Sequence, residues 1–138
     1  GILKSHTNLY PEDFEHFNNY KGLIIEGTGL GHSQTKGFDH ISKINEENKK
    51  ALEKLAKNCV VVLTSQCIFG RVMMNVYTPQ RELLGIGVLP GEDMTTETAF
   101  IKLAFLLSNY TKEEVKKMMS KNLAGEISER TENYDIEK

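Results

Sequence analysis

The stretch that decides the fold is residues 22–32, Gly-Leu-Ile-Ile-Glu-Gly-Thr-Gly-Leu-Gly-His, in which a short aliphatic run ends in glycines at alternate positions. Leu23, Ile24 and Ile25 are apolar without alternation, which predicts a strand covered on both faces, as in a parallel sheet between helices. The glycines that follow predict a tight loop, because glycine accepts positive φ and lets a ligand approach the backbone amides. Ligands of open α/β sheets bind outside the carboxyl ends of the strands, so the candidate site is expected at this loop.

Other apolar runs extend this pattern along the chain. Strands are expected at residues 2–3, 60–63 and 85–89, with a further extended portion at 72–77. Helices are expected at residues 11–20, 39–57, 79–84, 95–108 and from residue 111 onward. Strands that alternate with helices predict an α/β fold: a three-layer α/β/α sandwich, flavodoxin-like, with a parallel sheet of about four strands.

Length and charge narrow the class of protein. The 138 residues suit a single domain at residues 1–126, followed by a charged C-terminal tail at 127–138 that is expected to fray. With 17 basic and 19 acidic residues, the chain lacks the charge excess typical of proteins that bind nucleic acid or a membrane surface. No apolar run approaches the roughly 18 residues of a membrane-spanning helix, and the first residues do not resemble a signal peptide. A cytoplasmic protein is therefore expected.

The two cysteines predict neither a disulfide nor a metal site. If the chain from Cys59 to Cys67 is extended, their Cα atoms lie about 26 Å apart at roughly 3.3 Å per residue. A disulfide requires less than about 7 Å. The sequence has no C-x-x-C motif and no close Cys/His pairing, so no metal site is expected.

Polar residues gather where three of the expected strands end, at residues 6–8, 26–32 and 64–71. The candidates for a crevice or a regulatory site on this edge are Glu26, Thr28, Ser65, Gln66, Cys67 and Arg71. The spacing pairs none of Thr28, Ser65 and Cys67 with a particular histidine, so a nucleophile with its base is not identified. Cys67 is interpreted as a structural thiol in preference to a nucleophile, because only Arg71 stands near enough in sequence to activate it.

The glycine spacing argues against a dinucleotide site. That fingerprint is G-x-G-x-x-G, whereas here Gly27-x-Gly29-x-Gly31 places His32 at the position of the last glycine. A long polar segment also separates the glycines from the next expected helix, so no helix N-terminus stands ready for a pyrophosphate. His32 is interpreted as a hydrogen-bonding contact rather than a core histidine, and its role as acid, base or simple donor stays open.

These residues together resemble a known family. The segment 24–32, followed by 62–77 (Val-Leu-Thr-Ser-Gln-Cys-Ile-Phe-Gly-Arg-Val-Met-Met-Asn-Val-Tyr), resembles the C-terminal domain of L-asparaginase-type amidohydrolases. Segments 81–84, 87–95, 102–103 and 122–126 resemble it too, in the same order. Within the family, the combination of residues 64–72 and 74–77 is most similar to the D subunits of archaeal glutamyl-tRNA(Gln) amidotransferases, with type I archaeal asparaginases as close relatives.

The resemblance implies which domain carries the catalytic residues and which contributes contacts to the substrate. In the family, the nucleophilic threonine, a second threonine, an aspartate and a lysine belong to a larger N-terminal domain, and none of those motifs is present here. No catalytic residue is therefore expected in this domain. The family's active site lies between subunits, so Gly29, Gly31 and His32 are expected to contact the substrate of the neighbouring protomer. Some relatives carry asparagine at the position of His32, and some type I enzymes have a regulatory site in loops that correspond to the Cys67 region.

The function that the resemblance implies is hydrolysis of the side-chain amide of glutamine or asparagine, which releases ammonia for Gln-tRNA(Gln) formation. The implied partners are the N-terminal domain of the same chain, a second copy in a homodimer, and an amidotransferase E subunit that handles the tRNA. ATP and Mg are expected only in that E subunit, and no cofactor in this domain. Two alternatives remain: a type I L-asparaginase, and a free-standing flavodoxin-like module that binds a small anion.

Overall fold

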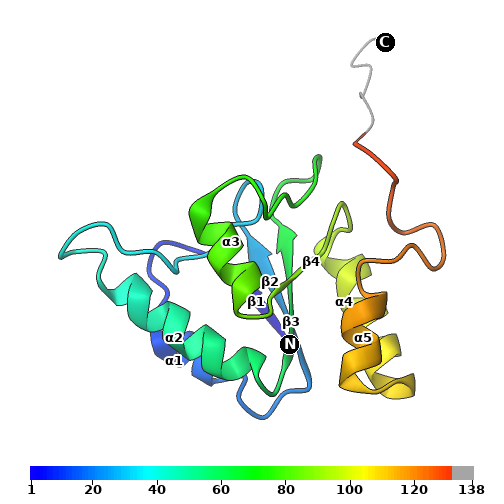
Figure 1. The fold of residues 1–138 in the computed structure, drawn as a ribbon, viewed down its shortest axis with the longest axis horizontal. Coiled ribbons are helices and arrows are strands. Elements are labelled where there is room, and N and C mark those ends of the chain that lie inside the picture. Colours follow the sequence, from blue (N-terminus) through cyan, green and yellow to red (C-terminus); the bar gives the residue numbers. More distant parts are fainter. Residues whose placement is uncertain (132–138) are drawn as a thin grey trace, which may run out of the picture.

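A computed structural model describes residues 1–131 and places them in three layers around a parallel sheet (Figure 1). The four strands are β1 (Ile2–Lys4), β2 (Gly22–Gly27), β3 (Val60–Ser65) and β4 (Leu89–Pro90). They pair in the order β1-β2-β3-β4, and every pair is parallel. The sequential order differs from the flavodoxin order 2-1-3-4-5, in which the chain reverses direction across the sheet.

Helices cover both faces of this sheet. They are α1 (Pro11–Glu15), α2 (Ile44–Ala56), α3 (Thr78–Gly85), α4 (Thr96–Asn109) and α5 (Lys112–Met118). The first three lie on one face, while α4 and α5 lie on the other (Figure 1). Right-handed crossovers that always step in one direction across a sheet leave their helices on the same face, which accounts for α1, α2 and α3. The predicted α/β sandwich is confirmed.

The two central strands supply side chains to both cores. In β2, Leu23 and Ile25 pack against α1, α2 and α3, while Ile24 packs with α4 and α5 on the opposite face. β3 repeats the alternation, with Val61 and Leu63 on the first face. The central side chains of both strands are fully buried. This two-sided burial explains the unbroken apolar runs, since each successive residue enters a different core.

Two helices are shorter than the sequence predicted. α1 ends at Glu15 rather than near Tyr20, and the next residues form turns. α2 begins at Ile44, because the carboxylate of Asp39 caps a separate turn by accepting the N–H groups of residues 41 and 42. Ile41 lies in that turn and is 77% exposed. A local side-chain cap therefore competes successfully with the extension of the helix.

The expected strand positions also need two corrections. Residues 72–77 form no strand, although Val72 and Met74 are buried. The fourth strand is confined to Leu89–Pro90, because Gly87 at φ +94° turns the chain after α3. In residues 72–77 and 86–88 the backbone is irregular. Some apolar side chains there are buried although the backbone is not paired with a neighbouring strand.

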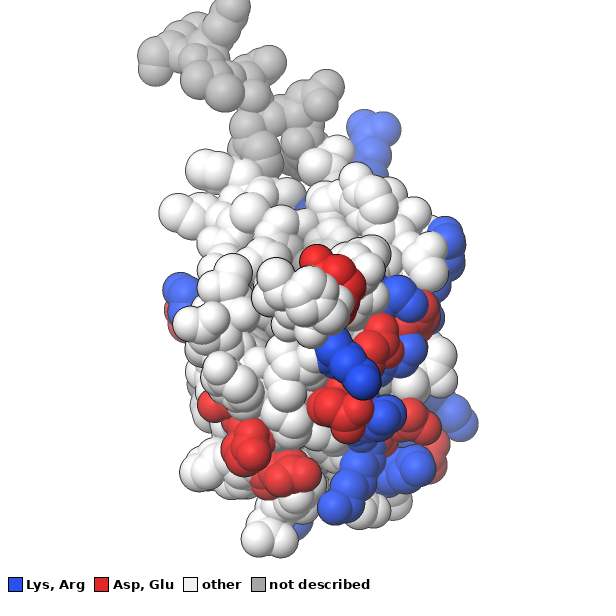
Figure 2. Space-filling model, turned by 90° about the vertical axis from the view of Figure 1, so that its left-hand side faces the viewer, with Lys and Arg blue, Asp and Glu red and all other residues white. Residues whose placement is uncertain are grey.

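Basic and acidic side chains lie interspersed on the face that Figure 2 shows. Ile127 is buried and Ser128 accepts and donates hydrogen bonds to the body of the domain, so the packed region continues past the predicted boundary at residue 126. The rest of the expected tail, residues 132–138, lies outside the described residues. None of the described helices is long and apolar enough to cross a membrane.

An ion pair fixes this C-terminal segment to α4. The ammonium of Lys102 lies 2.6 Å from the carboxylate of Glu126, and both side chains are largely buried. The same carboxylate accepts the backbone N–H groups of Leu123 and Ala124. Burial acts to raise the pKa of Glu126, but the hydrogen bonds from Lys102 and from the backbone outweigh it and lower the pKa to about 2. The ionised form of Glu126 is therefore the one that stabilises the fold.

We expect Glu126→Gln to destabilise the domain at neutral pH by about 2 kcal/mol, the scale of hydrogen bonds to a charged group. A pKa that is lower in the folded than in the unfolded state stabilises the fold above the unfolded value near 4.5, and this contribution disappears as the pH falls towards 2. Urea unfolding of the wild type and the variant should therefore give midpoints that differ at pH 7 and converge towards pH 2.5. Glu113→Gln, which removes an exposed partner of Lys116, is the control with little effect at either pH. A difference that stays constant with pH would contradict this role.

Candidate functional site

The glycine loop after β2 is a closed backbone turn. Thr28 and His32 form an isolated antiparallel bridge, in which each backbone N–H donates to the other residue's carbonyl at 2.9 Å. Gly29 and Gly31 take φ values of +52° and +95°, so both need the left-handed region that favours glycine. The space around them differs: a Cβ on Gly29 would meet no atom within 4 Å, whereas one on Gly31 would lie 2.7 Å from a methyl group of Val72. The tight loop predicted from the sequence is confirmed.

Neighbouring elements hold this loop by its carbonyl groups. The Ser65 hydroxyl, at the end of β3, donates to the Gly29 carbonyl at 2.5 Å. The Met73 N–H donates to the Leu30 carbonyl at 3.0 Å. The side-chain amide of Gln80 on α3 donates to the carbonyls of residues 30 and 31 at 2.7 and 3.2 Å. The loop is therefore a fixed platform.

His32 emerges from this platform into a surface cavity. Its half-buried ring lies against Tyr77, with ring centroids 5.4 Å apart and planes inclined by 50°. The cavity has a volume of about 530 Å³ and is lined by residues 32–36, Phe38 and residues 77–79. Tyr77 was not among the site residues predicted from the sequence. Its only local signal was its place just before the expected helix, and no spacing rule connects it with His32.

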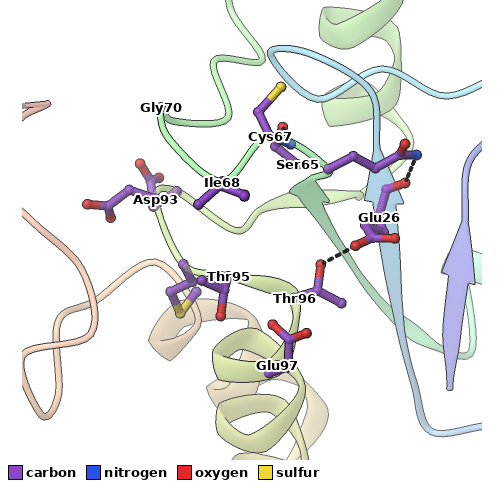
Figure 3. Close-up of a pocket in the computed structure, with 12 residues that line it drawn as sticks. Glu26, Ser65, Cys67, Ile68, Gly70, Asp93, Thr95, Thr96 and Glu97 are labelled. Atoms are coloured by element: carbon purple, nitrogen blue, oxygen red, sulfur yellow. Dashed lines mark hydrogen bonds between the residues drawn. The ribbon is translucent and has the colours of Figure 1, made fainter. Parts of the chain in front are cut away.

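A second cavity lies on the other side of the same sheet edge, between the ends of β2 and β3 and the start of α4 (Figure 3). It is smaller, about 170 Å³, and its lining includes Glu26, Ser65, Gln66 and Cys67 from the predicted set. The Glu26 carboxylate accepts a hydrogen bond from the Thr96 hydroxyl at 3.4 Å and lies 3.3 Å from the Lys4 ammonium. The Glu26 carboxylate therefore already has two partners within the domain, Thr96 and Lys4.

The glycine loop divides the predicted site residues into two groups. Gly31 and His32 belong to the side that faces α3, whereas Glu26, Gln66 and Cys67 belong to the side that faces α4. Thr28 begins the loop and lines neither cavity. Gln66 joins the strand ends, because its amide donates to the carbonyls of Ser5 and Glu26 at 2.7 and 3.0 Å.

Arg71 lies apart from both groups and serves the C-terminal segment. Its guanidinium contacts Glu92 at 3.3 Å and Asp93 at 3.6 Å, and it donates to the carbonyl of Ser128. Burial raises the pKa of Glu92, an effect that the charge of Arg71 opposes. Arg71 itself lines a different cavity from Cys67, while its two acidic partners, Glu92 and Asp93, line the Cys67 cavity.

The two cysteines have different surroundings. Cys59 is buried, and burial raises its pKa to about 11. Cys67 is exposed, against the expectation of a buried structural thiol, and its N–H donates to the Ser65 hydroxyl at 3.0 Å. Both thiols are free. Among residues 1–131, no group of three His, Cys, Asp or Glu side chains is placed to hold a metal ion.

The arrangement suits binding better than covalent chemistry. No hydrogen bond within residues 1–131 joins a serine, threonine or cysteine side chain to a histidine, so a nucleophile with its base is not assembled in this part of the chain. The glycine loop leads into the polar segment 33–43 and not into a helix N-terminus, a poor arrangement for a pyrophosphate. What the edge offers instead is a rigid loop with an imidazole and a phenol side by side.

Comparison with known proteins decides the family. Residues 1–119 match the sequence profile of the Glutaminase/Asparaginase C-terminal domain. The chain belongs to this family. It is 51% identical over 131 residues to the D subunit of the glutamyl-tRNA(Gln) amidotransferase of Methanococcus maripaludis, covering 94% of the chain and 29% of the relative. The corresponding D subunit of Pyrococcus abyssi is 46% identical, with 93% and 28% covered.

Solved structures of the same family agree with the fold. The thermostable L-asparaginase from Thermococcus kodakarensis superposes with a TM-score of 0.80 at 29% identity, over 92% of this chain and 37% of that one. L-asparaginase I from Vibrio cholerae gives a TM-score of 0.77 at 29% identity, over 93% and 37%. The chain thus spans less than a third of the D subunits from M. maripaludis and P. abyssi, and little more than a third of these enzymes. The resemblance to the C-terminal domain of asparaginase-type amidohydrolases is confirmed.

The geometry of the loop predicts unequal tolerance at its glycines. Gly31→Ala should lower the free energy of unfolding by about 3 kcal/mol, since it combines a positive φ with a forced approach to Val72. Gly29→Ala, with the open space around it, should cost only about 1 kcal/mol, the conformational penalty alone. Urea unfolding of the two variants measures both values. Equal losses at the two positions would show that the loop is not packed against Val72 as described.

Proposed function

We propose that this chain is the C-terminal domain of the asparaginase-like D subunit of an archaeal glutamyl-tRNA(Gln) amidotransferase. The full subunit would hydrolyse the side-chain amide of glutamine or asparagine and release ammonia for Gln-tRNA(Gln) formation. The identity of 51% to one such D subunit, against 29% to the L-asparaginases of solved structure, favours this function over a free type I L-asparaginase. Membership of the asparaginase family argues against a free-standing anion-binding module.

The observation that carries the proposal is the contact between His32, on a loop held by hydrogen bonds, and Tyr77, just before α3. The pair lies beside an open cavity and has no nucleophile next to it. In this proposal the cavity faces the active site of a neighbouring protomer, whose N-terminal domain supplies the reacting threonine. Gly29 and Gly31 give the loop its shape, and the imidazole and the phenol contact the polar end of the amino-acid substrate. The loop then completes a site for which this domain provides binding groups and the N-terminal domain of the neighbouring protomer provides the chemistry.

The proposed partners follow from the same assignment. They are the N-terminal domain of the same chain, a second copy in a homodimer, and an E subunit that handles the tRNA and holds ATP and Mg. The outer face of α4 supports docking by other domains, because Phe100, Ile101 and Phe105 are exposed there although the opposite side of the helix is already buried. Basic and acidic side chains are interspersed on the face that Figure 2 shows, so this face gives no footprint for tRNA. We propose a cytoplasmic location, a domain without a cofactor of its own, and a regulatory role for the Cys67 cavity in the parent subunit.

The 138-residue chain alone should release no ammonia from glutamine or asparagine. The activated nucleophile and its proton relay are proposed to lie in the N-terminal domain, and binding groups alone do not cleave an amide. A coupled ammonia assay on the purified chain, with a catalytically dead full-length subunit as the background control, measures this. Turnover above that background would place a catalytic group within these residues.

His32→Ala in the full-length subunit should raise KM for the amide substrate by about tenfold to a hundredfold, the equivalent of one or two hydrogen bonds to a charged group. A group that holds the substrate's polar end contributes about equally to the ground and transition states, so kcat should change little. Steady-state kinetics separates the two constants. His16→Ala, which removes an exposed histidine near Tyr20 and away from the glycine loop, is the matched control.

The division between the two constants also tests the assignment of His32. A collapse of kcat with an unchanged KM would make His32 part of the proton relay and not a binding residue. Unchanged values of both constants would remove the loop from the site altogether.

A further inference from the structure

Gln80 is a fully buried amide that joins the two halves of the candidate site. It lies on α3 with no exposed surface. Its Nε2 donates to the carbonyl oxygens of Leu30 and Gly31 at 2.7 and 3.2 Å. Its Oε1 accepts the backbone N–H of Tyr77 at 3.3 Å. The orientation of the amide is dictated by its partners, because two carbonyl oxygens can only accept and an N–H can only donate.

These three hydrogen bonds end next to the two rings of the site. Leu30 and Gly31 immediately precede His32, and the third bond ends on Tyr77 itself. Among the hydrogen bonds of residues 1–131, only those of Gln80 connect the glycine loop with the backbone of Tyr77. The contact between the His32 and Tyr77 rings thus spans two segments that one side chain holds in register.

We propose that Gln80 is a positioning residue that sets the spacing of His32 and Tyr77 for the polar end of the amino-acid substrate. The inference rests on the proposed function and adds a residue that touches neither substrate nor solvent. Without the amide, the carbonyls of residues 30 and 31 lose a buried donor and the loop moves to find new partners. A displacement of about 1 Å is enough to weaken a binding arrangement substantially.

A buried amide can also hold backbone carbonyl groups without connecting the two rings, as Asn48 shows. Asn48 on α2 is equally buried and donates to the carbonyls of Leu9 and Gln34 at 2.9 and 3.0 Å. Its bonds do not reach the Tyr77 segment. The test must therefore separate a loss of stability from a loss of alignment between the rings.

The test variant is Gln80→Met in the full-length subunit, because methionine has a similar unbranched shape and no donor. We expect KM for glutamine or asparagine to rise by about tenfold or more while kcat stays within about threefold. Leu55→Ala on α2, a buried apolar position outside the site, should lower the thermal midpoint but leave both constants near wild type. If Gln80→Met does not fold, Gln80→Leu replaces it in the same measurements.

A double variant tests whether Gln80→Met raises KM through the position of His32. If Gln80 acts by placing the ring of His32, then Gln80→Met should raise KM far less in a His32→Ala background than in the wild type. Nuclear Overhauser contacts between the two rings, measured with labelled histidine and tyrosine, should weaken in Gln80→Met and persist in Leu55→Ala.

The outcomes distinguish the two levels of inference. If Gln80→Met changes KM no more than Leu55→Ala does, or if its effect multiplies fully with that of His32→Ala, the positioning role is overturned while the proposed function stands. If His32→Ala itself leaves KM unchanged, the proposed binding role of His32 fails independently of Gln80. Retention of the ring contacts in a Gln80→Met variant with raised KM would likewise overturn the positioning role.

Discussion

The structure depends on the parallel pairing of β2 with β3, two strands that are buried on both faces. Six residue pairs join them, from Gly22–Val60 to Gly27–Ser65. Because consecutive side chains enter opposite cores, neither face can be left open to water, and the chain must provide a layer of helices on each side. Only the edges at the strand ends then remain for polar groups and irregular backbone. The position of the site is thus a consequence of the core.

The burial of β2 and β3 on both faces leaves a local signal in the sequence, so most of the fold could be predicted. The apolar runs at residues 23–25 and 60–63, the proline near the start of α3 and the capping box of α5 each act through near neighbours in the chain. Where the predicted helices and strands are wrong, a specific competing interaction accounts for the difference. At Asp39 a side-chain cap stops the helix from starting, and at Val72 and Met74 apolar side chains fill the core without forming a strand. The spacing of apolar residues predicts which side chains are buried, but not which backbone conformation buries them.

The candidate site was predictable only in part, because its groups meet across long stretches of sequence. His32 and the glycines stand out locally, through spacing and composition. Tyr77 and Gln80 do not, since an aromatic residue and an amide before a helix have no special local pattern. They acquire a role only when the β3–α3 connection folds back over the glycine loop. The polar groups of the predicted sheet edge line two cavities, because the closed turn between Thr28 and His32 stands between the α3 side and the α4 side of the edge.

The rigidity of the glycine loop is what makes a purely binding role physically reasonable. A loop that must be ordered when the ligand arrives loses part of the interaction free energy to conformational entropy. Here that ordering is completed during folding: backbone bonds close the turn, and Ser65, Met73 and Gln80 fix its carbonyl groups from three directions. The positive φ angles of Gly29 and Gly31 are accepted without a side-chain penalty. The polar atoms of His32 and Tyr77 remain beside an open cavity, so a partner that supplies the reacting groups would meet a preformed surface.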